Sequence, residues 1–170
     1  MPLSGKTLVA EILEEEGFSM LDMGDIVRIE MEKRDIGPEK TGKFVNEMRE
    51  EHGMDGIAKL CTPYLEEMLE SEEKIVITGM RGIEEKERFE EETNETVEMI
   101  AVWSSPSTRR KRREERQRPE DTEGQSFEER DLRDLDNGVG DLMALSNHLV
   151  KNEGTMDELE EKVLEIVQED

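Results

Sequence analysis

Short apolar runs that lie between stretches with helical apolar spacing restrict the fold of this chain more than any other feature. Two of the runs are Ile75-Val76-Ile77 and Met99-Ile100-Ala101-Val102-Trp103. Such runs are typical of strands buried on both faces, and strands that alternate with helices form parallel sheets. The length of 170 residues suits one domain. We therefore predict a single α/β domain over 1–170, with ligands bound at the carboxyl ends of its parallel strands.

The expected elements follow from apolar spacing and from the positions of glycine and proline. Helices are predicted over 6–16, 24–34, 39–52, 55–69, 83–91, 106–119, 126–135, 138–146 and 155–167. Strands are predicted over 18–23, 74–78, 97–103 and 148–152, and 120–125 is predicted to be a mobile loop. Pro63 is expected to kink its helix, and Thr155 to cap the last one.

The chain is strongly acidic, with 46 Asp and Glu residues against 23 Lys and Arg and a formal net charge of -23. This charge disfavours general binding to nucleic acid or to anionic membranes. No apolar run approaches the roughly 20 residues that span a bilayer, so we expect a cytoplasmic protein. The acidic residues are spread along the whole chain and predict a solvated surface. We expect a halophilic source, whose salt would screen the repulsion between carboxylates, and an ordinary acidic protein is the alternative.

The sequence also limits redox and zinc chemistry. Cys61 is the single cysteine, which excludes an intrachain disulfide, and the two histidines are His52 and His148. A zinc site built from histidine and cysteine is therefore not expected. Cys61 lies in a predicted helix and is interpreted as a buried thiol rather than a nucleophile.

The tetrapeptide Ser4-Gly5-Lys6-Thr7 precedes the first predicted helix and carries the clearest chemical signal. It matches the end of the phosphate-binding loop G-x-x-x-x-G-K-[ST], in which backbone N–H groups and a helix N-terminus hold phosphates. In that motif Lys6 reaches the β- and γ-phosphates of ATP, and the Thr7 hydroxyl holds Mg²⁺. The alternative is a helix cap followed by a surface lysine.

The first glycine of the full motif, and the strand that normally precedes it, would fall before Met1. We expect one of two explanations. Either Met1 is an internal methionine of a longer protein, or the fold lacks its first strand.

An arginine-rich helix is predicted after Pro106. Arg109, Arg112 and Arg116 are spaced at i, i+3 and i+7, so they share one helix face and could converge on one polyphosphate. Two other interpretations remain open for 108–118: a solvated basic face paired with glutamates, and an RNA-binding strip. The strip is disfavoured because the segment contains no aromatic residue for base stacking.

Several blocks along 1–167 together carry a resemblance to a known family. They are Met-Pro-Leu-Ser-Gly-Lys-Thr at 1–7, Met-Gly-Asp-Ile-Val-Arg at 23–28, Ile-Thr-Gly-Met-Arg-Gly at 77–82, Ser-Ser-Pro-Ser-Thr-Arg at 104–109, Glu-Arg-Asp at 129–131 and Val-Lys-Asn-Glu-Gly at 150–154. With these blocks the sequence resembles an uncharacterised archaeal family of P-loop kinase-like ATPases, related to adenylate kinase and dephospho-CoA kinase.

The resemblance implies a P-loop NTPase three-layer fold with a parallel sheet, similar to nucleoside monophosphate kinases. In that fold the strand before the phosphate loop is central, and it is the strand this sequence lacks. The resemblance also implies an acceptor-binding helical insert over about 24–70 and an arginine-rich lid region over about 106–131.

Roles for individual residues come from the same resemblance. Asp25, Arg28 and Arg81 fall at acceptor-binding positions, while Asn152 and Gly154 fall in the loop beside the nucleotide base. Ser4, Gly5, Lys6 and Thr7 are expected to bind the cofactor, and Thr7 the metal. Catalytic roles are implied for Lys6, Arg112, Arg116 and Arg130, and Arg109 and Arg118 lie in the same arginine-rich region.

Two residues depart from the family pattern. Thr78 stands where relatives carry an acidic residue that positions Mg²⁺ or its waters, and Leu3 replaces a glycine of the loop. Asp25 is then the best candidate for a carboxylate near the metal or acceptor, with Asp121 and Asp131 as alternatives.

The hypothesis that follows is an ATP-dependent, Mg²⁺-requiring kinase that transfers the γ-phosphoryl group to a nucleotide-like acceptor. The acceptor classes considered are nucleoside monophosphates and dephospho-CoA. The alternatives are an ATP-binding regulatory or assembly module with little turnover, and an N-terminally truncated product.

Overall fold

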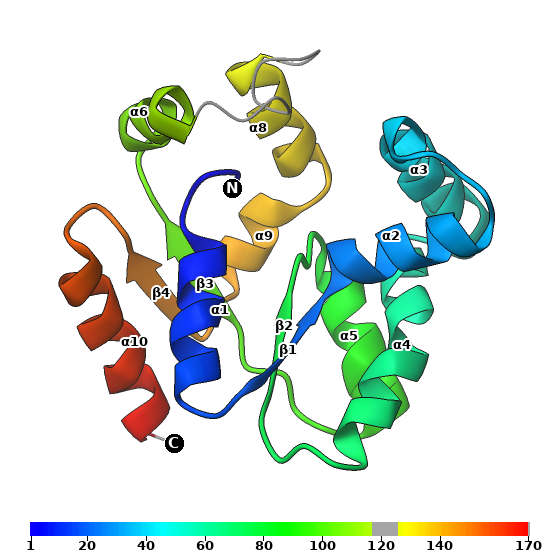
Figure 1. Ribbon diagram of the computed structural model, residues 1–170, viewed down its shortest axis with the longest axis horizontal. Helices are drawn as coiled ribbons and strands as arrows, with labels where there is room; N and C mark the ends of the chain where they lie inside the picture. Colours follow the sequence, from blue (N-terminus) through cyan, green and yellow to red (C-terminus); the bar gives the residue numbers. More distant parts are fainter. Residues whose placement is uncertain (117–125, 170) are drawn as a thin grey trace. The chain divides into compact units, whose positions relative to one another are not determined.

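The computed structural model describes residues 1–116 and 126–169, the side chains of 116 and 169 excepted. The chain divides into two compact units, one made of Met1–Leu13 with Glu98–Asp170 and the other of Glu14–Val97. Figure 1 labels their helices and strands. The predicted loop 120–125, Arg118 and Asp121 lie outside the described residues.

The first unit is built around a pair of parallel strands. Its elements are α1 (Lys6–Glu15), β3 (Ile100–Trp103), α6 (Pro106–Arg116), α8 (Phe127–Asp136), α9 (Val139–Ala144), β4 (His148–Lys151) and α10 (Met156–Glu169). In the strand pair, Ile100 lies opposite His148 and Trp103 opposite Lys151. Helix α10 packs against β4, and α9 against β3. The buried apolar residues are Val9, Ala10, Ile12, Leu13, Val102, Phe127, Val139, Val150, Leu159 and Val163.

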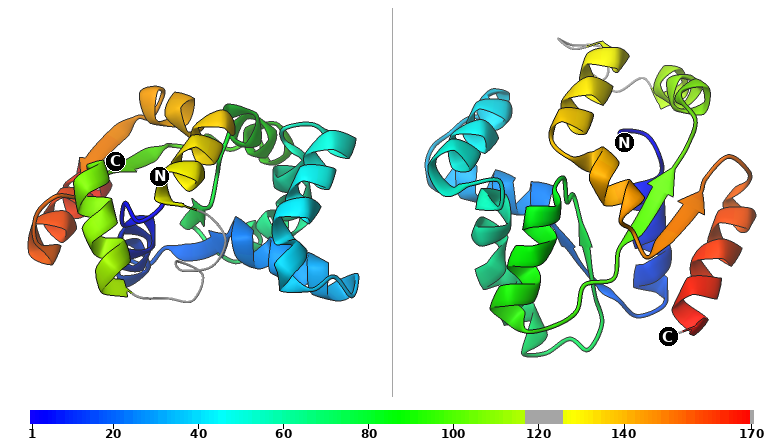
Figure 2. Two further views of the ribbon diagram at one scale, coloured as in Figure 1. Left: turned by 90° about the horizontal axis from the view of Figure 1, so that it is seen from above. Right: turned by 180° about the vertical axis from the view of Figure 1, so that it is seen from behind.

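The second unit contains the other strand pair and a group of packed helices. Its elements are β1 (Ser19–Asp22), α2 (Met23–Lys33), the 3-10 helix η1 (Pro38–Lys40), α3 (Thr41–His52), α4 (Gly56–Leu69), β2 (Ile75–Thr78) and α5 (Ile83–Thr93). Strands β1 and β2 run parallel, with Asp22 opposite Thr78 at their carboxyl ends. Helix α4 packs against α2, α3 and α5 (Figures 1 and 2). The core includes Leu21, Met31, Phe44, Cys61 and Phe89.

Local sequence explains where several helices begin. The Asp22 carboxylate accepts a hydrogen bond of 2.9 Å from the Asp25 N–H and so caps α2. Ser126 and Glu129 exchange side-chain bonds with each other's backbone N–H at the start of α8. Thr155 and Glu158 do the same at α10, which confirms Thr155 as its cap. Such reciprocal bonds satisfy N–H groups that a helix start leaves without acceptors.

The predicted helices and strands are all present where the structure describes them, with small shifts of their ends. The largest shift concerns the strand predicted over 97–103, because β3 begins only at Ile100. The Val97 N–H donates instead to the Glu90 side chain at 3.0 Å, so this residue is held by α5 rather than by a strand. Helix α4 runs on through Pro63.

Strand direction agrees with the α/β prediction, since both pairings are parallel. The described strands, however, form two separate two-stranded sheets rather than one. No described residue forms a strand that hydrogen-bonds to both sheets. Among the helices of 1–116 and 126–169, none is long and apolar enough to cross a membrane.

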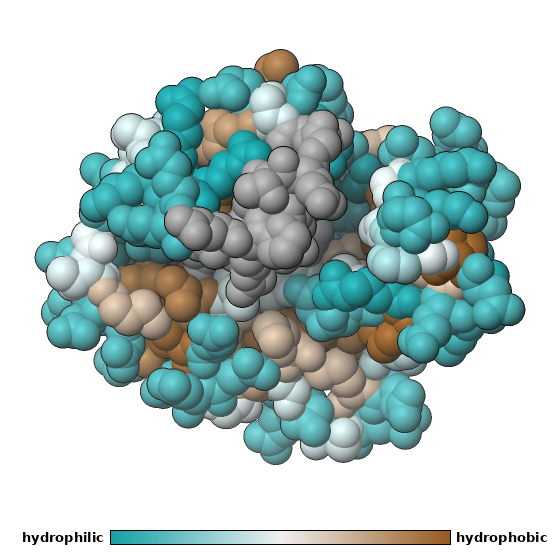
Figure 3. All heavy atoms as spheres, turned by 45° about the horizontal axis from the view of Figure 1, so that its top comes forward, coloured by the Kyte–Doolittle hydropathy of each residue, from teal (hydrophilic) through white to brown (hydrophobic). Residues whose placement is uncertain are grey.

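The high negative charge of the chain bears on its stability. On the face in Figure 3, the coloured residues are mostly hydrophilic. A net charge of -23 on 170 residues implies mutual repulsion in the folded state. Dissolved salt weakens that repulsion, because the screening length falls from about 10 Å at 0.1 M to about 3 Å at 1 M salt.

We predict that raising KCl from 0.1 M to 2 M increases the thermal midpoint of unfolding. Relief of about 2 kcal/mol of repulsion corresponds to an increase of roughly 4–8 °C for a chain of this size. Differential scanning calorimetry measures the shift. Sucrose, which stabilises folded proteins without screening charge, is the control for general solute effects. An unchanged or lower midpoint in KCl would contradict the prediction.

Candidate phosphate-binding site

Residues 2–5 form a turn that leads directly into α1. Leu3 and Gly5 both have positive φ, at 61° and 103°. The first helical bond after the turn runs from the Val9 N–H to the Gly5 carbonyl at 3.1 Å. The N–H groups of residues 6–8 precede this bond and have no intrahelical acceptor. The turn and the helix start therefore bring together N–H groups and the positive end of a helix dipole.

Three consecutive carbonyls of this turn are held by side chains from α6 and from the residues that follow β3 and β4. The bonds run from Arg109 to the Pro2 carbonyl (3.4 Å), from Arg112 to that of Leu3 (3.2 Å), and from Asn152, Ser104 and Arg112 to that of Ser4 (2.9, 3.1 and 3.3 Å). All peptide bonds are trans. In a planar trans peptide the N–H of the next residue points opposite to the carbonyl. The N–H groups of residues 3–5 therefore face the other side of the turn, as in an anion-binding nest.

The Ser4 hydroxyl is an unsatisfied group at this turn. Ser4 is 1% exposed, and its Oγ has no hydrogen-bond partner. Leaving a buried hydroxyl unpaired costs about 1–3 kcal/mol, so such a group is expected where a bound molecule completes it. An oxyanion such as phosphate can accept this hydrogen bond and those of the neighbouring N–H groups. The residues present therefore fit a phosphate group.

Arg109 connects the turn to two helices. Its guanidinium is buried and makes two bonds of 2.6 Å to the Asp131 carboxylate on α8. Its Nε donates to the Ser104 carbonyl at 3.2 Å, and the group lies 4.8 Å from the centre of the Phe127 ring. Arg109 thus holds α6, α8 and the turn together.

The partly buried Arg112 and the buried Asn152 form a second connection. Arg112 donates to the Ser104 hydroxyl at 2.9 Å and to the Asn152 side-chain oxygen at 3.0 Å. The Asn152 amide nitrogen donates to the Ser4 carbonyl, so both the oxygen and the nitrogen of this amide are hydrogen-bonded beside the turn of residues 2–5. Arg112 was expected at a polyphosphate and Asn152 beside a base. In this structure both lie on the carbonyl side of the turn, opposite to its N–H groups. Gly154 lies farther along and is exposed, beside Glu158.

The other expected residues of this unit are placed as follows. Lys6 opens α1 and is partly buried, and Thr7 is exposed in its first turn. Arg116 ends α6, and its side chain lies outside the described part of the structure. Arg130 is partly buried on α8. Asp131, an alternative for the metal carboxylate, is the partner of Arg109.

In the second unit, Asp22 and Thr78 meet at the carboxyl ends of β1 and β2. The Thr78 hydroxyl donates to the Asp22 carboxylate at 2.6 Å. Arg28 contacts Asp25 closely and lies 4.0 Å from Asp22, while Asp25 itself is exposed. The carboxylate beside Thr78 is thus Asp22, a residue that the sequence analysis missed. Its signal was present, because Asp22 directly follows the apolar residues of a strand.

Arg81 follows β2 and its backbone is fixed by a buried carboxylate. Glu85, 1% exposed, accepts from the Arg81 N–H at 2.6 Å and from the Gly82 N–H at 3.4 Å. Burial raises the pKa of Glu85, although these N–H groups and the guanidinium of Arg49, 3.7 Å away, act in the opposite direction. Arg81, Asp25 and Arg28 thus all lie near the carboxyl end of this strand pair.

Cys61 is confirmed as a buried residue of α4. Burial raises the pKa of its thiol to about 12, and the charges of Glu85 and Asp22 add to the increase. A thiol in this state is a poor nucleophile at neutral pH. Within 1–116 and 126–169, no group of three or more His, Cys, Asp or Glu residues could hold a metal ion.

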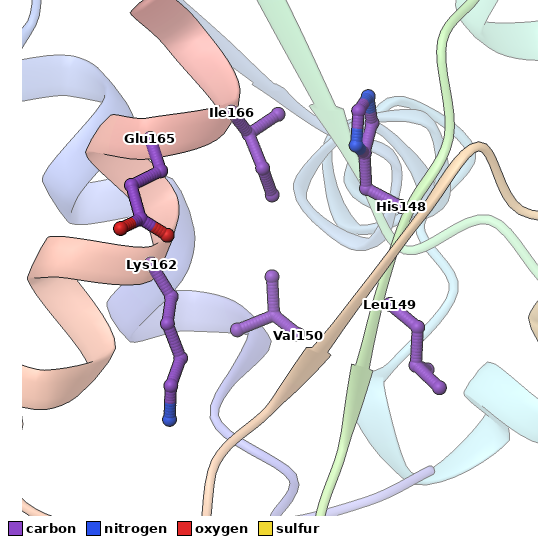
Figure 4. Close-up of a pocket in the computed structure, with 6 residues that line it drawn as sticks. All are labelled: His148, Leu149, Val150, Lys162, Glu165 and Ile166. Atoms are coloured by element: carbon purple, nitrogen blue, oxygen red, sulfur yellow. The ribbon is translucent and has the colours of Figure 1, made fainter.

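The first unit also has an open hollow between β4 and α10. Its lining residues are His148, Leu149, Val150, Lys162, Glu165 and Ile166. In Figure 4, Val150 points toward α10 and Leu149 points away from it. None of residues 2–7 lines this hollow, so it is distinct from the phosphate-binding turn.

We predict that Gly5→Ala destabilises the protein more than Gly17→Ala does. Both glycines have positive φ, which costs alanine about 1 kcal/mol. A Cβ at Gly17 meets no atom within 4 Å, whereas one at Gly5 would lie 2.2 Å from the Asn152 amide nitrogen. Displacing Asn152 also breaks its bonds to Ser4 and Arg112, so urea unfolding should show a loss of about 2–3 kcal/mol. Equal losses for both variants would disprove the close contact.

Comparison with known proteins agrees with the phosphate-binding interpretation. The model of the family described as AAA domain matches residues 1–126. This match and the parallel strands place the chain in the P-loop NTPase class of nucleotide-binding proteins.

Curated archaeal proteins are similar over almost the whole chain. The UPF0200 protein of Methanocaldococcus jannaschii is 35% identical over 172 residues, covering 99% of this chain and 86% of that protein. A UPF0200 protein of Thermococcus gammatolerans is 34% identical, covering 99% and 90%. The UPF0200/UPF0201 protein of Archaeoglobus fulgidus is 35% identical over 169 residues, and the chain spans about half of it (52%). The chain therefore belongs to the UPF0200 family, with a P-loop domain of the AAA class.

Proposed function

We propose that this protein is an ATP-dependent kinase that phosphorylates a nucleotide-like small molecule. The observation that carries the proposal is the turn at residues 2–5, whose N–H groups continue into the start of α1 beside the unpaired Ser4 hydroxyl. These donors suit the phosphates of a nucleotide. In a chain with a net charge of -23, such a local set of donors is needed to bind an anion.

The residues of the loop have distinct roles in this proposal. Ser4 and Gly5 bind phosphate oxygens through their N–H groups, and Lys6 neutralises the β- and γ-phosphates. Thr7, exposed at the first turn of α1, would hold Mg²⁺ together with phosphate oxygens. The ion supplies neutralisation of the charge that develops during phosphoryl transfer. Arg116 and Arg130 are further candidates for neutralising that charge.

The second unit is proposed to bind the acceptor. Arg28 and Arg81 offer guanidinium groups for an acceptor phosphate, and Asp22 offers a carboxylate whose Oδ2 already accepts from Thr78. An attacking hydroxyl loses a proton, and Asp22 would accept it as general base. An attacking phosphate oxygen is already ionised and needs no base. The carboxylate therefore favours a hydroxyl acceptor, as in the dephospho-CoA class, over a nucleoside monophosphate.

We also propose that the chain has a fold similar to that of nucleoside monophosphate kinases. A nucleoside monophosphate kinase-like fold places a strand directly before the phosphate loop, whereas the described residues hold two separate strand pairs. We propose that residues 1–170 lack that strand. Comparing the chain with a version extended upstream to the next start codon tests this point. Higher ATP affinity of the extended version is expected, and equal affinity would refute it.

A second candidate function is an ATP-binding regulatory or assembly module with little turnover. The observation that favours it is the positive φ of Leu3, at 61°, which strains a loop residue where glycine would not be strained. ATP binding without transfer to any acceptor, accompanied by a change in association state, would support this module.

We predict that Lys6→Gln weakens Mg·ATP binding by about 10- to 100-fold, since a charge-assisted contact to phosphate contributes about 1.5–3 kcal/mol. Isothermal titration calorimetry in molar KCl measures the dissociation constant. Lys40→Gln, at an exposed lysine of η1, removes the same charge elsewhere and should leave it unchanged. Equal effects of the two substitutions would indicate a bulk charge effect rather than a phosphate site.

We predict that Asp22→Asn lowers γ-phosphoryl transfer to a hydroxyl acceptor by about 100-fold or more, because the general base is lost. Asparagine caps helices as well as aspartate, so α2 should stay intact. Radiolabelled transfer from ATP to dephospho-CoA and to nucleoside monophosphates is the assay. Asp35→Asn, at an exposed aspartate that follows α2 and has a positive φ that asparagine also adopts, is the matched control and should leave the transfer rate unchanged. Full activity of Asp22→Asn would remove Asp22 from the chemistry.

A further inference from the structure

We infer that Arg109 and Asp131 are positioning residues for the phosphate loop and do not themselves contact the nucleotide. This inference rests on the proposed nucleotide site and adds a statement about how that site is held. Arg109 bonds the Pro2 carbonyl at 3.4 Å on one side and the Asp131 carboxylate at 2.6 Å on the other. A bond to the carbonyl side of the turn fixes the direction of the N–H groups on its opposite side.

Most N–H donors of the Arg109 guanidinium are already used in hydrogen bonds within the protein. Its Nη1 and Nη2 both donate to Asp131, Nη1 also to Pro2, and Nε to the Ser104 carbonyl. The Phe127 ring lies against the group, which is 3% exposed. Turning this side chain toward a phosphate would leave the partly buried Asp131 carboxylate without its ion-pair partner. The bidentate pair therefore favours a fixed guanidinium over a mobile one.

Asp131 acts through Arg109 because it fixes the plane of the guanidinium. A bidentate pair restricts rotation of that plane more than a single bond does. Arg109 Nη1 lies in the same plane and donates to the Pro2 carbonyl. The position of Asp131 on α8 therefore also fixes the orientation of the first peptide group of the turn. Arg112 holds the next two carbonyls, and the two arginines together keep residues 2–4 turned the same way.

The opposite interpretation makes a different prediction. Suppose instead that Arg109 leaves Asp131 to bind phosphate when a nucleotide arrives. Removal of the Asp131 charge would then free the guanidinium and strengthen nucleotide binding. If Arg109 positions the loop, the same change disorders residues 3–5 and weakens binding. The direction of the change in affinity therefore distinguishes the two roles.

The experiment uses three variants of the full chain. Asp131→Asn removes the charge. Arg109→Lys keeps a cation beside Asp131 but replaces the planar guanidinium, whose three nitrogens bond Asp131, Pro2 and Ser104, by a single ammonium nitrogen without that geometry. Glu128→Gln is the control, because Glu128 pairs with Arg110 across the same two helices at 2.9 Å on the exposed surface. Calorimetry measures the dissociation constant of Mg·ATP. Amide order parameters of residues 3–5 are measured by NMR without ligand.

We expect Arg109→Lys and Asp131→Asn to weaken Mg·ATP binding by about tenfold or more, and Glu128→Gln to leave it within about twofold. The loop order parameters should fall from about 0.85 to below about 0.6 in the first two variants only. Unchanged or tighter binding by folded Arg109→Lys would overturn the inference.

Two further outcomes separate the inference from the proposed function. If the unchanged protein does not bind Mg·ATP, the proposed function fails, and the order parameters alone decide the inference. Rigid loop amides in Arg109→Lys would then overturn it. If Asp131→Asn does not fold, Arg109→Lys still decides, because its ion pair with Asp131 is retained.

Discussion

The nucleotide site proposed for this protein depends on the direction in which three peptide groups point. The carbonyls of residues 2–4 are hydrogen-bonded to Arg109, Arg112 and Asn152, so the N–H groups that follow them turn the other way. A turn of this length has no regular secondary structure to fix its peptides. Side chains must do so, and arginine suits the task because one guanidinium can donate to several carbonyls at fixed angles.

This arrangement also explains how an acidic chain can hold an anion. The average field of the molecule is negative, but the network places the buried Arg109 guanidinium, the partly buried Arg112 guanidinium, a helix N-terminus and several N–H groups around the same turn. Low local polarity strengthens each of these contacts relative to the solvent-exposed acidic surface. The buried Ser4 hydroxyl, without a partner of its own, is consistent with a site completed by a ligand.

Much of the fold could be predicted because it follows from short-range rules. Apolar spacing located the helices and strands, and Thr155 was identified as a cap from its position alone. The start of β3 was predicted too early, because apolar character does not reveal that the Val97 N–H bonds to Glu90. The separation into two strand pairs depends on long-range pairing, which periodicity does not encode.

The motif of the candidate site could be predicted from the sequence, but the side-chain contacts that hold the loop in place could not. Ser4-Gly5-Lys6-Thr7 indicated the loop, and helix spacing correctly placed Arg109 and Arg112 on one face. The direction in which the two arginine side chains point could not be predicted, because the carbonyls that they bond belong to residues more than 100 positions away in the sequence. Asp22 was missed for a related reason, since only the register of β1 and β2 brings it beside Thr78.

A crystal structure of the protein with Mg²⁺ and a non-hydrolysable ATP analogue would test the central claim most directly. The account predicts phosphate oxygens within about 3.2 Å of the N–H groups of Ser4 and Gly5 and of those at the start of α1, with the Ser4 hydroxyl donating to one of them. Arg109 would keep its bonds to Pro2 and Asp131. A nucleotide bound elsewhere, or a loop whose carbonyls face the phosphates, would contradict it.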